Sequence, residues 1–240
     1  MAVSSLLGPI LLLIKPWHWA LRDVGFGALS GVSMSLGLLL LYRGYSVSRI
    51  GVVAPVSSVM LAAVPVVYAM SSGERPGLAA ALGMALGVCA LVLTTWQPGG
   101  VGSTSQGLVL GLISGALFGV AFICMDAASD AAGLLPVLIQ RVVGFTLLAS
   151  MQPFERSKLI IVAGAQRYIA WATGVFAMTA LASLQLGYEF GSAGPVSVAV
   201  SQFATAAVVL SVVFNHERMR WWQTCGVGAS AVGVALLALG

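Results

Sequence analysis

Long apolar runs separated by short polar breaks occupy almost the whole chain. They lie near residues 23–42, 50–71, 77–95, 107–125, 133–151, 167–187, 194–214 and 220–239, with a shorter apolar stretch at 1–14. A helix of about 20 apolar residues crosses the roughly 30 Å hydrocarbon core of a bilayer. The pattern therefore predicts an all-α membrane protein, a polytopic helical bundle of about eight transmembrane helices with an amino-terminal stub.

The composition supports a lipid environment. Hydrophobic residues make up 59% of the 240 residues and charged residues only 8%, whereas roughly 25% of an average soluble domain is charged. Trp17, Trp19, Trp96, Trp221 and Trp222 fall at span ends, where indole rings prefer the headgroup level. We expect a multi-pass protein of the cytoplasmic membrane, surrounded by membrane lipids.

Several other classes of protein are disfavoured. The eleven basic residues are scattered rather than gathered in a stripe, so nucleic acid is not expected as a partner. Cys89, Cys124 and Cys225 lie far apart without CxxC spacing or neighbouring histidines, which argues against a disulfide framework and a metal site. No catalytic motif or cofactor signature is present. The chain is therefore not expected to be an enzyme, to bind a cofactor, or to lose Met1–Ile14 as a signal peptide.

An internal repeat holds one register without a gap. A single constant offset pairs Gly44-Tyr45 with Gly187-Tyr188, Gly51 with Gly194, Ser58 with Ser201, Glu74-Arg75 with Glu217-Arg218, and Gly83 with Gly226. The second copy contains five predicted helices, and an odd number reverses the orientation of consecutive copies. Inverted repeats around a site at the membrane midplane are a common plan of secondary transporters.

The repeat divides the chain into residues 1–95 and residues 107–240. The first copy lacks counterparts of Gly107–Val143, which would form its first helix and part of its second. Two explanations stay open, an incomplete reading of a longer gene and a shortened variant with a re-entrant or interfacial start.

The motifs of both copies resemble a known repeat unit. Gly51-Val-Val-Ala-Pro-Val-Ser-Ser, Ser72-Gly-Glu-Arg-Pro76 and Gly83-Met-Ala-Leu-Gly87 resemble the end of an EamA domain, and Gly194-Pro-Val-Ser through Asn215-His-Glu-Arg218 resembles it again. The EamA domain is the repeat unit of the drug/metabolite transporter superfamily, which typically carries two units in ten helices. The resemblance implies two inverted EamA-like repeats and a permease, but Pro65 is replaced by Val208 in the second copy.

Polar residues inside apolar spans are the candidates for a binding site, because they are costly in hydrocarbon unless they face a partner or a cavity. Arg141 is the basic residue well inside a span; it either attracts an anionic group of a solute, or pairs with Asp126 or Asp130, or extends to the interface. The full candidate set, expected to line a cavity between the repeats, is Ser58, Gln140, Arg141, Trp171, Gln185, Ser201 and Gln202.

The remaining polar residues favour structural roles. Serine and threonine also bond to carbonyls of their own helix. The charged turns Glu74-Arg75 and Glu217-Arg218, and Glu189, lie at span ends and are expected to be solvated.

Glycines and prolines inside the spans predict how the helices pack. Gly107, Gly111, Gly115 and Gly119 recur at every fourth residue, and such ridges allow helices to pack closely in lipid. Pro55, Pro65 and Pro136 lie inside apolar spans and are expected to kink helices next to a cavity.

The sequence thus predicts a transporter of a small organic solute that works by alternating access. A neutral, zwitterionic or mildly amphipathic solute is favoured, because charge inside the spans is sparse. A non-transporting scaffold or inactive remnant, and a membrane enzyme acting on lipid, remain alternatives. A homodimer is an open alternative to a single copy.

Basic residues predict the orientation. The family plan would put Lys15, Arg22 and Arg75 inside, against seven basic residues on the other face, which reverses the usual bias toward the cytoplasm. We therefore expect a cytoplasmic Pro153–Gln166 loop and an outer carboxyl terminus. A reporter fused after Gly240 should be active outside the cytoplasm, and activity in the cytoplasm alone would restore the family orientation.

Overall fold

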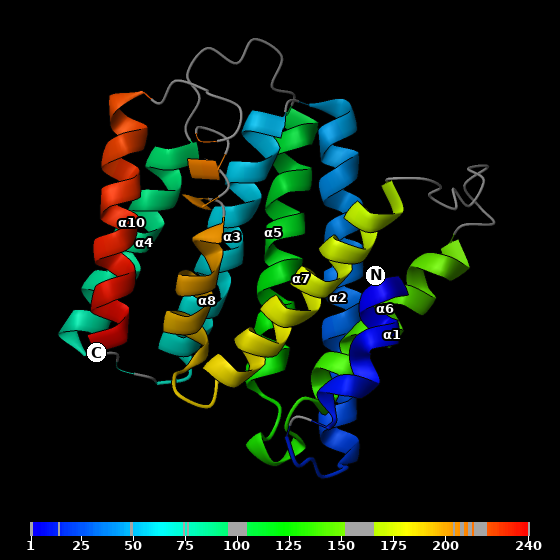
Figure 1. The fold of residues 1–240 in the computed structure, drawn as a ribbon. Coiled ribbons are helices and arrows are strands. Elements are labelled where there is room, and N and C mark those ends of the chain that lie inside the picture. Colours follow the sequence, from blue (N-terminus) through cyan, green and yellow to red (C-terminus); the bar gives the residue numbers. More distant parts are fainter. Residues whose placement is uncertain are drawn as a thin grey trace. The chain divides into compact units, whose positions relative to one another are not determined.

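The computed structural model describes residues 2–13, 15–48, 50–73, 75, 77–95, 105–151, 166–203, 205–206, 209–210, 213 and 220–239. Regular structure in this part of the chain is helical, as predicted (Figure 1). The helices are α1 (Ala2–Leu11), α2 (Leu21–Val47), α3 (Ile50–Ser71), α4 (Leu78–Thr95), α5 (Ser105–Asp126), the 3-10 helix η1 (Asp130–Ala132), α6 (Leu135–Met151), α7 (Gln166–Gly187), α8 (Ala193–Ser201) and α10 (Trp221–Leu239).

Some sequence predictions fall outside the described residues. These are the predictions for Glu74, Trp96, Val208, His216, Glu217-Arg218 and nearly all of the Pro153–Gln166 loop. Among the residues that are described, three helices are long and apolar enough to cross a membrane by length and composition: Leu21–Val47, Ser105–Asp126 and Arg167–Gly187. Shorter apolar helices lie at Val56–Ser71, Leu78–Thr94 and Leu135–Met151.

The chain divides into two compact units. Unit 1 comprises Met1–Ser35 and Ala121–Phe190, and unit 2 comprises Leu36–Val120 and Gly191–Gly240. Helices α2 and α5 contribute residues to both. Each unit therefore combines segments of both predicted repeats, and the division into 1–95 and 107–240 stays a prediction.

In unit 1, α2 packs closely on α6 through glycines. A Cβ atom on Gly31 would lie 2.6 Å from the carbonyl oxygen of Gln140, and one on Gly27 would lie 2.9 Å from that of Pro136. These two glycines are four residues apart and so share one face of α2, the arrangement that lets helix backbones approach each other in lipid. The α2–α6 distance is therefore set by the absence of side chains.

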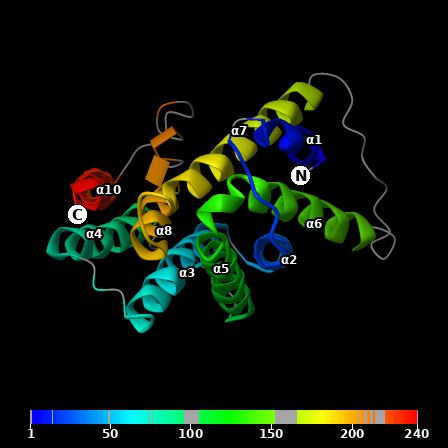
Figure 2. The same ribbon diagram turned by 90° about the horizontal axis from the view of Figure 1, so that it is seen from below.

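The amino-terminal stub is a short helix of unit 1. Gly8 of α1 abuts Leu138 of α6 and lies near Met178 of α7, and the Ser5 hydroxyl donates to the backbone carbonyl of Arg141 at 3.0 Å. Figure 2 shows α1 beside α6 and α7. The predicted stub is thus a helix packed on two others.

The start of α6 differs from the sequence prediction. The sequence predicts a helix from Gly133 with a kink at Pro136, but Gly133 has a φ of 55° and closes the turn after η1. The helix begins at Leu135, so Pro136 lies in its first turn. Proline costs no hydrogen bond there, because the first N–H groups of a helix have no partner within it.

In unit 2, the predicted glycine ridge of α5 packs on α3. A Cβ atom on Gly111 would lie 3.1 Å from the carbonyl oxygen of Val53, one on Gly115 would lie 2.6 Å from the Cβ of Met60, and one on Gly119 would lie 2.6 Å from that of Val64. The expectation that these glycines form a packing face is confirmed.

Helices α4 and α10 run antiparallel in unit 2 and exchange equivalent contacts. Gly83 meets Leu237 at 3.0 Å, and Gly226 meets Thr94 at 2.7 Å, each distance measured from the place that a Cβ atom would take on the glycine. Gly226 is the counterpart of Gly83 in the repeat, and Leu237 follows Thr94 at the same offset. One contact is therefore the repeat-related copy of the other, as in a self-complementary two-fold interface.

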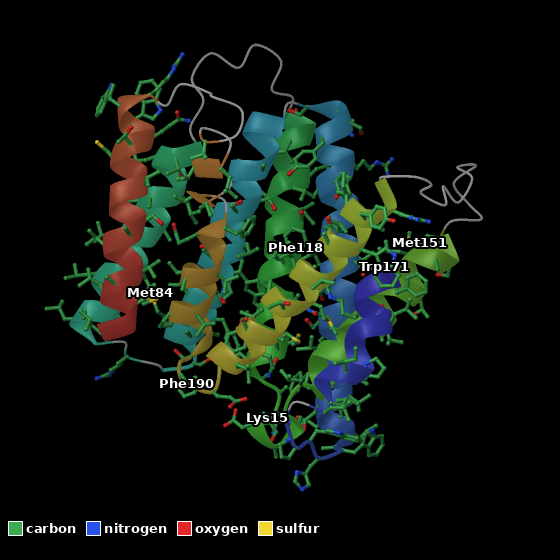
Figure 3. The ribbon with its side chains drawn as sticks, viewed as in Figure 1. Lys15, Met84, Phe118, Met151, Trp171 and Phe190 are labelled. Carbon is green, nitrogen blue, oxygen red and sulfur yellow. The ribbon has the colours of Figure 1, made fainter. Side chains whose placement is uncertain are left out.

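Helix α8 packs on α3 and α4 beside this pair (Figure 2). The start of α8 lies near the end of α3, since a Cβ on Gly194 would be 3.5 Å from that of Ala69. The sulfur of Met84, on α4, lies 3.4 Å from the same position (Figure 3). Helices α3 and α8 begin at repeat-related residues, as do α4 and α10. Antiparallel packing of such counterparts requires an axis across the helices, which is the geometry expected of inverted copies.

We predict that Gly115→Ala lowers the stability of the folded protein. The methyl group would overlap Met60 and the Ser57 carbonyl, and overpacking of this kind costs about 1–3 kcal/mol. Thermal unfolding in detergent should show a lower midpoint. Gly228→Ala is the matched control, because nothing lies within 4 Å of a Cβ there; an equal loss in both variants would contradict the prediction.

Candidate functional site

The seven predicted site residues fall into two groups. Gln140, Arg141, Trp171 and Gln185 belong to unit 1, and Ser58, Ser201 and Gln202 belong to unit 2. The hydrogen bonds described below lie within one unit each. The expectation that all seven line one cavity stays a prediction.

Gln140 occupies a buried position on α6, where it is 2% exposed. Its Nε2 donates to the Ser30 hydroxyl at 2.7 Å, and that hydroxyl donates to the Ala121 carbonyl at 2.8 Å. Gln140 Oε1 is buried without a hydrogen-bond partner. A buried acceptor without a partner costs about 1–3 kcal/mol, so it calls for a functional or structural explanation.

Arg141, the next residue of α6, is held by one backbone contact. Its Nη2 donates to the Ala177 carbonyl of α7 at 3.2 Å, while Nε is buried without a partner. Among the described residues it forms no salt bridge with Asp126 or Asp130. The expected alternative of an ion pair is therefore not observed, and a partly buried cation keeps an unused donor.

Gln185 lies at the end of α7 and is 3% exposed. Its Nε2 donates to the Met125 carbonyl at 3.4 Å, and that carbonyl, in the last turn of α5, also accepts from the Ala128 N–H at 3.4 Å. Its Oε1 is buried without a partner, like that of Gln140. One end of this amide therefore caps α5, and the other is open.

Trp171 lies on the same stripe of α7 as Gly174, Met178, Leu181 and Gln185. It is 49% exposed, and most of the neighbouring residues at the start of α7 are exposed as well (Figure 3). In the part of the chain that the structure describes, no hydrogen bond joins it to Gln140, Arg141 or Gln185. Its predicted role in binding rests on its position along the stripe alone.

In unit 2, the two predicted serines bond to their own helices. The Ser58 hydroxyl donates to the Ala54 carbonyl at 3.0 Å, and the Ser201 hydroxyl donates to the Val198 carbonyl at 2.7 Å. Bonds of this kind satisfy a hydroxyl in lipid without any ligand. They match the structural alternative that the sequence left open.

Gln202 is the centre of a hydrogen-bonded network in unit 2. Its Nε2 donates to the carbonyls of Gly87 and Val198, both at 3.2 Å. Its Oε1 accepts from the hydroxyls of Thr205 at 3.2 Å and Ser230 at 2.8 Å. The amide therefore uses both of its donors and both acceptor positions, and it joins α8 to α4 and α10.

The same network interrupts α8. The Gln202 N–H donates to the Ala199 carbonyl at 3.3 Å, whereas the Val198 carbonyl accepts from two side chains, those of Ser201 and Gln202. Side chains that take over a helical carbonyl bend or break the helix. The Gln202 carbonyl then accepts from the Ala206 N–H at 2.9 Å, which restores the helical pattern.

The network is not repeated at the positions that the repeat offset relates to it. It includes Thr94, whose hydroxyl lies 3.3 Å from that of Thr205, and Gln223, which donates to the Thr94 carbonyl at 3.2 Å. At the repeat offset the counterparts of Thr94, Gln202, Thr205, Gln223 and Ser230 are Leu237, Val59, Ala62, Ala80 and Gly87. The counterparts are all apolar or glycine, so the two copies differ in polarity at these positions.

Sequence reasoning missed Ser30 and Asp23. Asp23 is 3% exposed, and its carboxylate accepts from the Ser129 N–H at 2.9 Å. It lies in the first turn of α2, where a carboxylate is favoured by the helix dipole. The signal that could have found Ser30 is its place beside Gly31 in the Gly27-x-x-x-Gly31 spacing. Glu189, expected to be solvated, instead pairs with Lys15, the salt bridge found among the described residues.

Comparison with known proteins shows the family of the chain. The profile of the EamA-like transporter family matches residues 105–239, more than half of the chain. The chain belongs to the EamA-like transporter family. A crystal structure of a protein with 13% sequence identity superposes with a TM-score of 0.80, covering 99% of this chain and 85% of that chain. At this identity the likeness shows the fold alone. A search of curated proteins gave no match.

Family membership confirms several sequence predictions. The EamA resemblance was correct, and the chain is an all-α membrane bundle of the EamA type. Members of this family are named as transporters. Among the described residues, the network around Gln202 in unit 2 is satisfied, whereas Gln140, Arg141 and Gln185 in unit 1 each keep a buried polar atom without a hydrogen-bond partner, as Ser197 does in unit 2.

We predict an energetic coupling between Gln202 and Ser230. Gln202→Leu and Ser230→Ala each remove the 2.8 Å hydrogen bond, and side-chain bonds between membrane helices contribute about 0.6 kcal/mol on average and up to about 1.7. A double-mutant cycle of unfolding free energies should give a coupling in this range. The Gln202→Leu and Ser58→Ala pair is the control, since the Ser58 hydroxyl donates to the Ala54 carbonyl of its own helix and not to Gln202; equal coupling in both cycles would contradict the prediction.

Proposed function

We propose that this EamA-like chain is a secondary transporter that moves a small organic solute across the cytoplasmic membrane by alternating access. The observation that carries the proposal is that three predicted site residues of unit 1 each keep a buried polar atom without a hydrogen-bond partner: Gln140 Oε1, Arg141 Nε and Gln185 Oε1. Polar atoms without partners are expensive inside a membrane protein, and they mark solute pathways.

The three side chains that carry these atoms are held by hydrogen bonds to neighbouring helices. The Gln140 amide reaches the Ala121 carbonyl of α5 through Ser30, and the Gln185 amide reaches the Met125 carbonyl of the same helix. Carbonyls four residues apart lie on one face of a helix, about 6 Å apart along its axis. The two amides are therefore anchored on adjacent turns of α5. Arg141 follows Gln140 directly and is tied to α7.

The available atoms favour a particular kind of solute. Two amide oxygens accept hydrogen bonds, and one guanidinium donates and carries positive charge. A small neutral or zwitterionic solute, such as an amino acid or its derivative, complements this set better than a multiply charged anion does. Trp171 supplies an aromatic surface farther along α7.

Two alternatives are kept as outcomes of the test. An inactive scaffold would show no solute movement, although it too would need the satisfied network of Gln202. An enzyme acting on lipid would need converging acidic, histidine or cysteine residues; among the described residues no group of three such side chains could hold a metal ion. The unused atoms beside Arg141 favour transport over both.

We predict that Arg141→Met lowers the rate of solute uptake by about tenfold or more, because a hydrogen bond to a charged group contributes about 1.5–3 kcal/mol. Purified protein would be placed in liposomes, and the uptake of each common radiolabelled amino acid would be measured. Arg167→Met is the matched control, since Arg167 is exposed on α7 and bonds to the neighbouring Tyr168.

Three results would contradict the proposal. If liposomes with wild-type protein take up no more of any amino acid or drug-like amine than empty liposomes do, the scaffold is favoured. Release of a modified lipid in the same liposomes would favour the enzyme. Equal loss in Arg141→Met and Arg167→Met would remove Arg141 from the site.

A further inference from the structure

We propose that Ser30 is a positioning residue that fixes which end of the Gln140 amide faces the solute, and so decides that the solute must present a hydrogen-bond donor there. The inference rests on the proposed function, because it concerns the selectivity of the same site. It is carried by the hydrogen-bond geometry of Ser30 and by the close contact of α2 with α6.

The single hydroxyl proton of Ser30 determines which end of the Gln140 amide can bond to it. A serine hydroxyl has a single proton, and that of Ser30 is directed at the Ala121 carbonyl, 2.8 Å away, which can only accept. Toward Gln140, at 2.7 Å, the Ser30 oxygen must therefore act as an acceptor. Only the NH₂ end of the amide can donate to it. The amide oxygen is thereby directed to the other side.

Water cannot take the place of Ser30 as the hydrogen-bond partner of Gln140. Ser30 is fully buried, and Gln140 is 2% exposed, so bulk water does not replace a lost partner. If the amide exchanged its two ends, its oxygen would face the Ser30 oxygen, and the hydroxyl could donate to it only by giving up its bond to the Ala121 carbonyl. Either outcome loses a buried hydrogen bond. One orientation of the amide is therefore strongly favoured.

Close backbone contact fixes the spacing of α2 and α6. Gly31 follows Ser30, and a Cβ on it would lie 2.6 Å from the Gln140 carbonyl oxygen and 3.1 Å from the Gln140 Cα. The α2 backbone thus lies directly against the residue that Ser30 orients. Gly27 makes a similar approach to Pro136 one turn earlier. Because these contacts are with backbone atoms, the Ser30 hydroxyl is held within bonding distance of the amide.

The consequence is a rule of selectivity. Gln140 offers Oε1, a buried acceptor without a partner, and a solute group with an N–H or O–H satisfies it. A solute group that can only accept would leave two acceptors face to face. When the Ser30 hydroxyl is removed, the amide is free to turn and offer its N–H groups instead. Ser30 would then change what the site accepts without touching the solute.

A purely structural role for Ser30 makes a different prediction. Ser30 also joins α2, α5 and α6, so its removal could lower stability and the amount of folded protein alone. That effect would reduce the maximal rate of uptake and leave the KM unchanged. The positioning role instead raises the KM and leaves the maximal rate per folded molecule nearly constant.

The transport test uses the full chain in liposomes and the radiolabelled amino acid that wild-type protein takes up fastest. Ser30→Ala is expected to raise the KM about fivefold to tenfold, since it removes one buried hydrogen bond from the binding group, and to change the maximal rate less than about twofold. Ser30→Thr, which keeps the hydroxyl, should restore the KM to within about twofold of wild type.

Ser33→Ala is the matched control, because Ser33 is a buried serine of the same helix that forms no hydrogen bond with Gln140. Its KM should equal that of wild type. An unchanged KM in Ser30→Ala, or equal KM changes in Ser30→Ala and Ser33→Ala, would overturn the positioning role. So would a loss of maximal rate with no change in KM.

A second measurement does not depend on transport. Glutamine labelled with ¹⁵N in the side chain gives an NMR signal for the Gln140 amide in detergent, assigned by its loss in Gln140→Leu. We expect the hydrogen exchange of this NH₂ group to be about tenfold faster in Ser30→Ala and unchanged in Ser33→Ala. Unchanged exchange in Ser30→Ala overturns the positioning role, whereas absent uptake by wild-type protein overturns the proposed function.

Discussion

The close approach of helix backbones at glycine is the constraint on which the rest of the structure depends. With charged residues making up only 8% of the chain, few ion pairs are available to hold the helices, and in lipid the hydrophobic effect does not draw apolar helices together. Gly31 of α2 lies against α6, Gly115 of α5 lies against α3, and Gly83 of α4 lies against α10, each so close to backbone or Cβ atoms that a side chain would not fit. Such contacts place side chains such as Ser30 and Gln202 near carbonyls of the next helix, which supply hydrogen bonds that lipid does not.

The amides and the guanidinium of the predicted site residues are used differently in the two units. In unit 2, Gln202 fills all of its hydrogen-bonding positions and ties α8 to α4 and α10. In unit 1, Gln140 and Gln185 are bonded at the nitrogen and open at the oxygen, and Arg141 keeps an unused Nε. A satisfied network holds helices in one arrangement, whereas an unsatisfied set needs a partner from outside. This difference is the reason to look for solute contacts beside Arg141.

The sequence predicted the helices well and the roles of polar residues less well. Apolar length located the spans, and the four-residue spacing of Gly111, Gly115 and Gly119 identified a packing face, because both properties are local. Gln140 and Gln202 looked alike in the sequence, as single amides inside apolar runs. Their difference depends on partners distant in the chain, Ser30 for one and Gly87 and Ser230 for the other. No local pattern specifies those pairings. The kink predicted at Pro136 was wrong because α6 begins two residues later than predicted, which puts the proline in the first turn, where it breaks no hydrogen bond.

The Gln202 network also constrains the order in which the chain can enter the membrane. Gly87 precedes Gln202 in the chain and is already in place when α8 is made, but Ser230 follows 28 residues later. Until α10 emerges from the ribosome, the amide oxygen of Gln202 lacks one of its two donors and would face hydrocarbon at a cost. Helix α8 should therefore leave the translocation channel for the lipid only together with α10, so that α10 completes the insertion of α8.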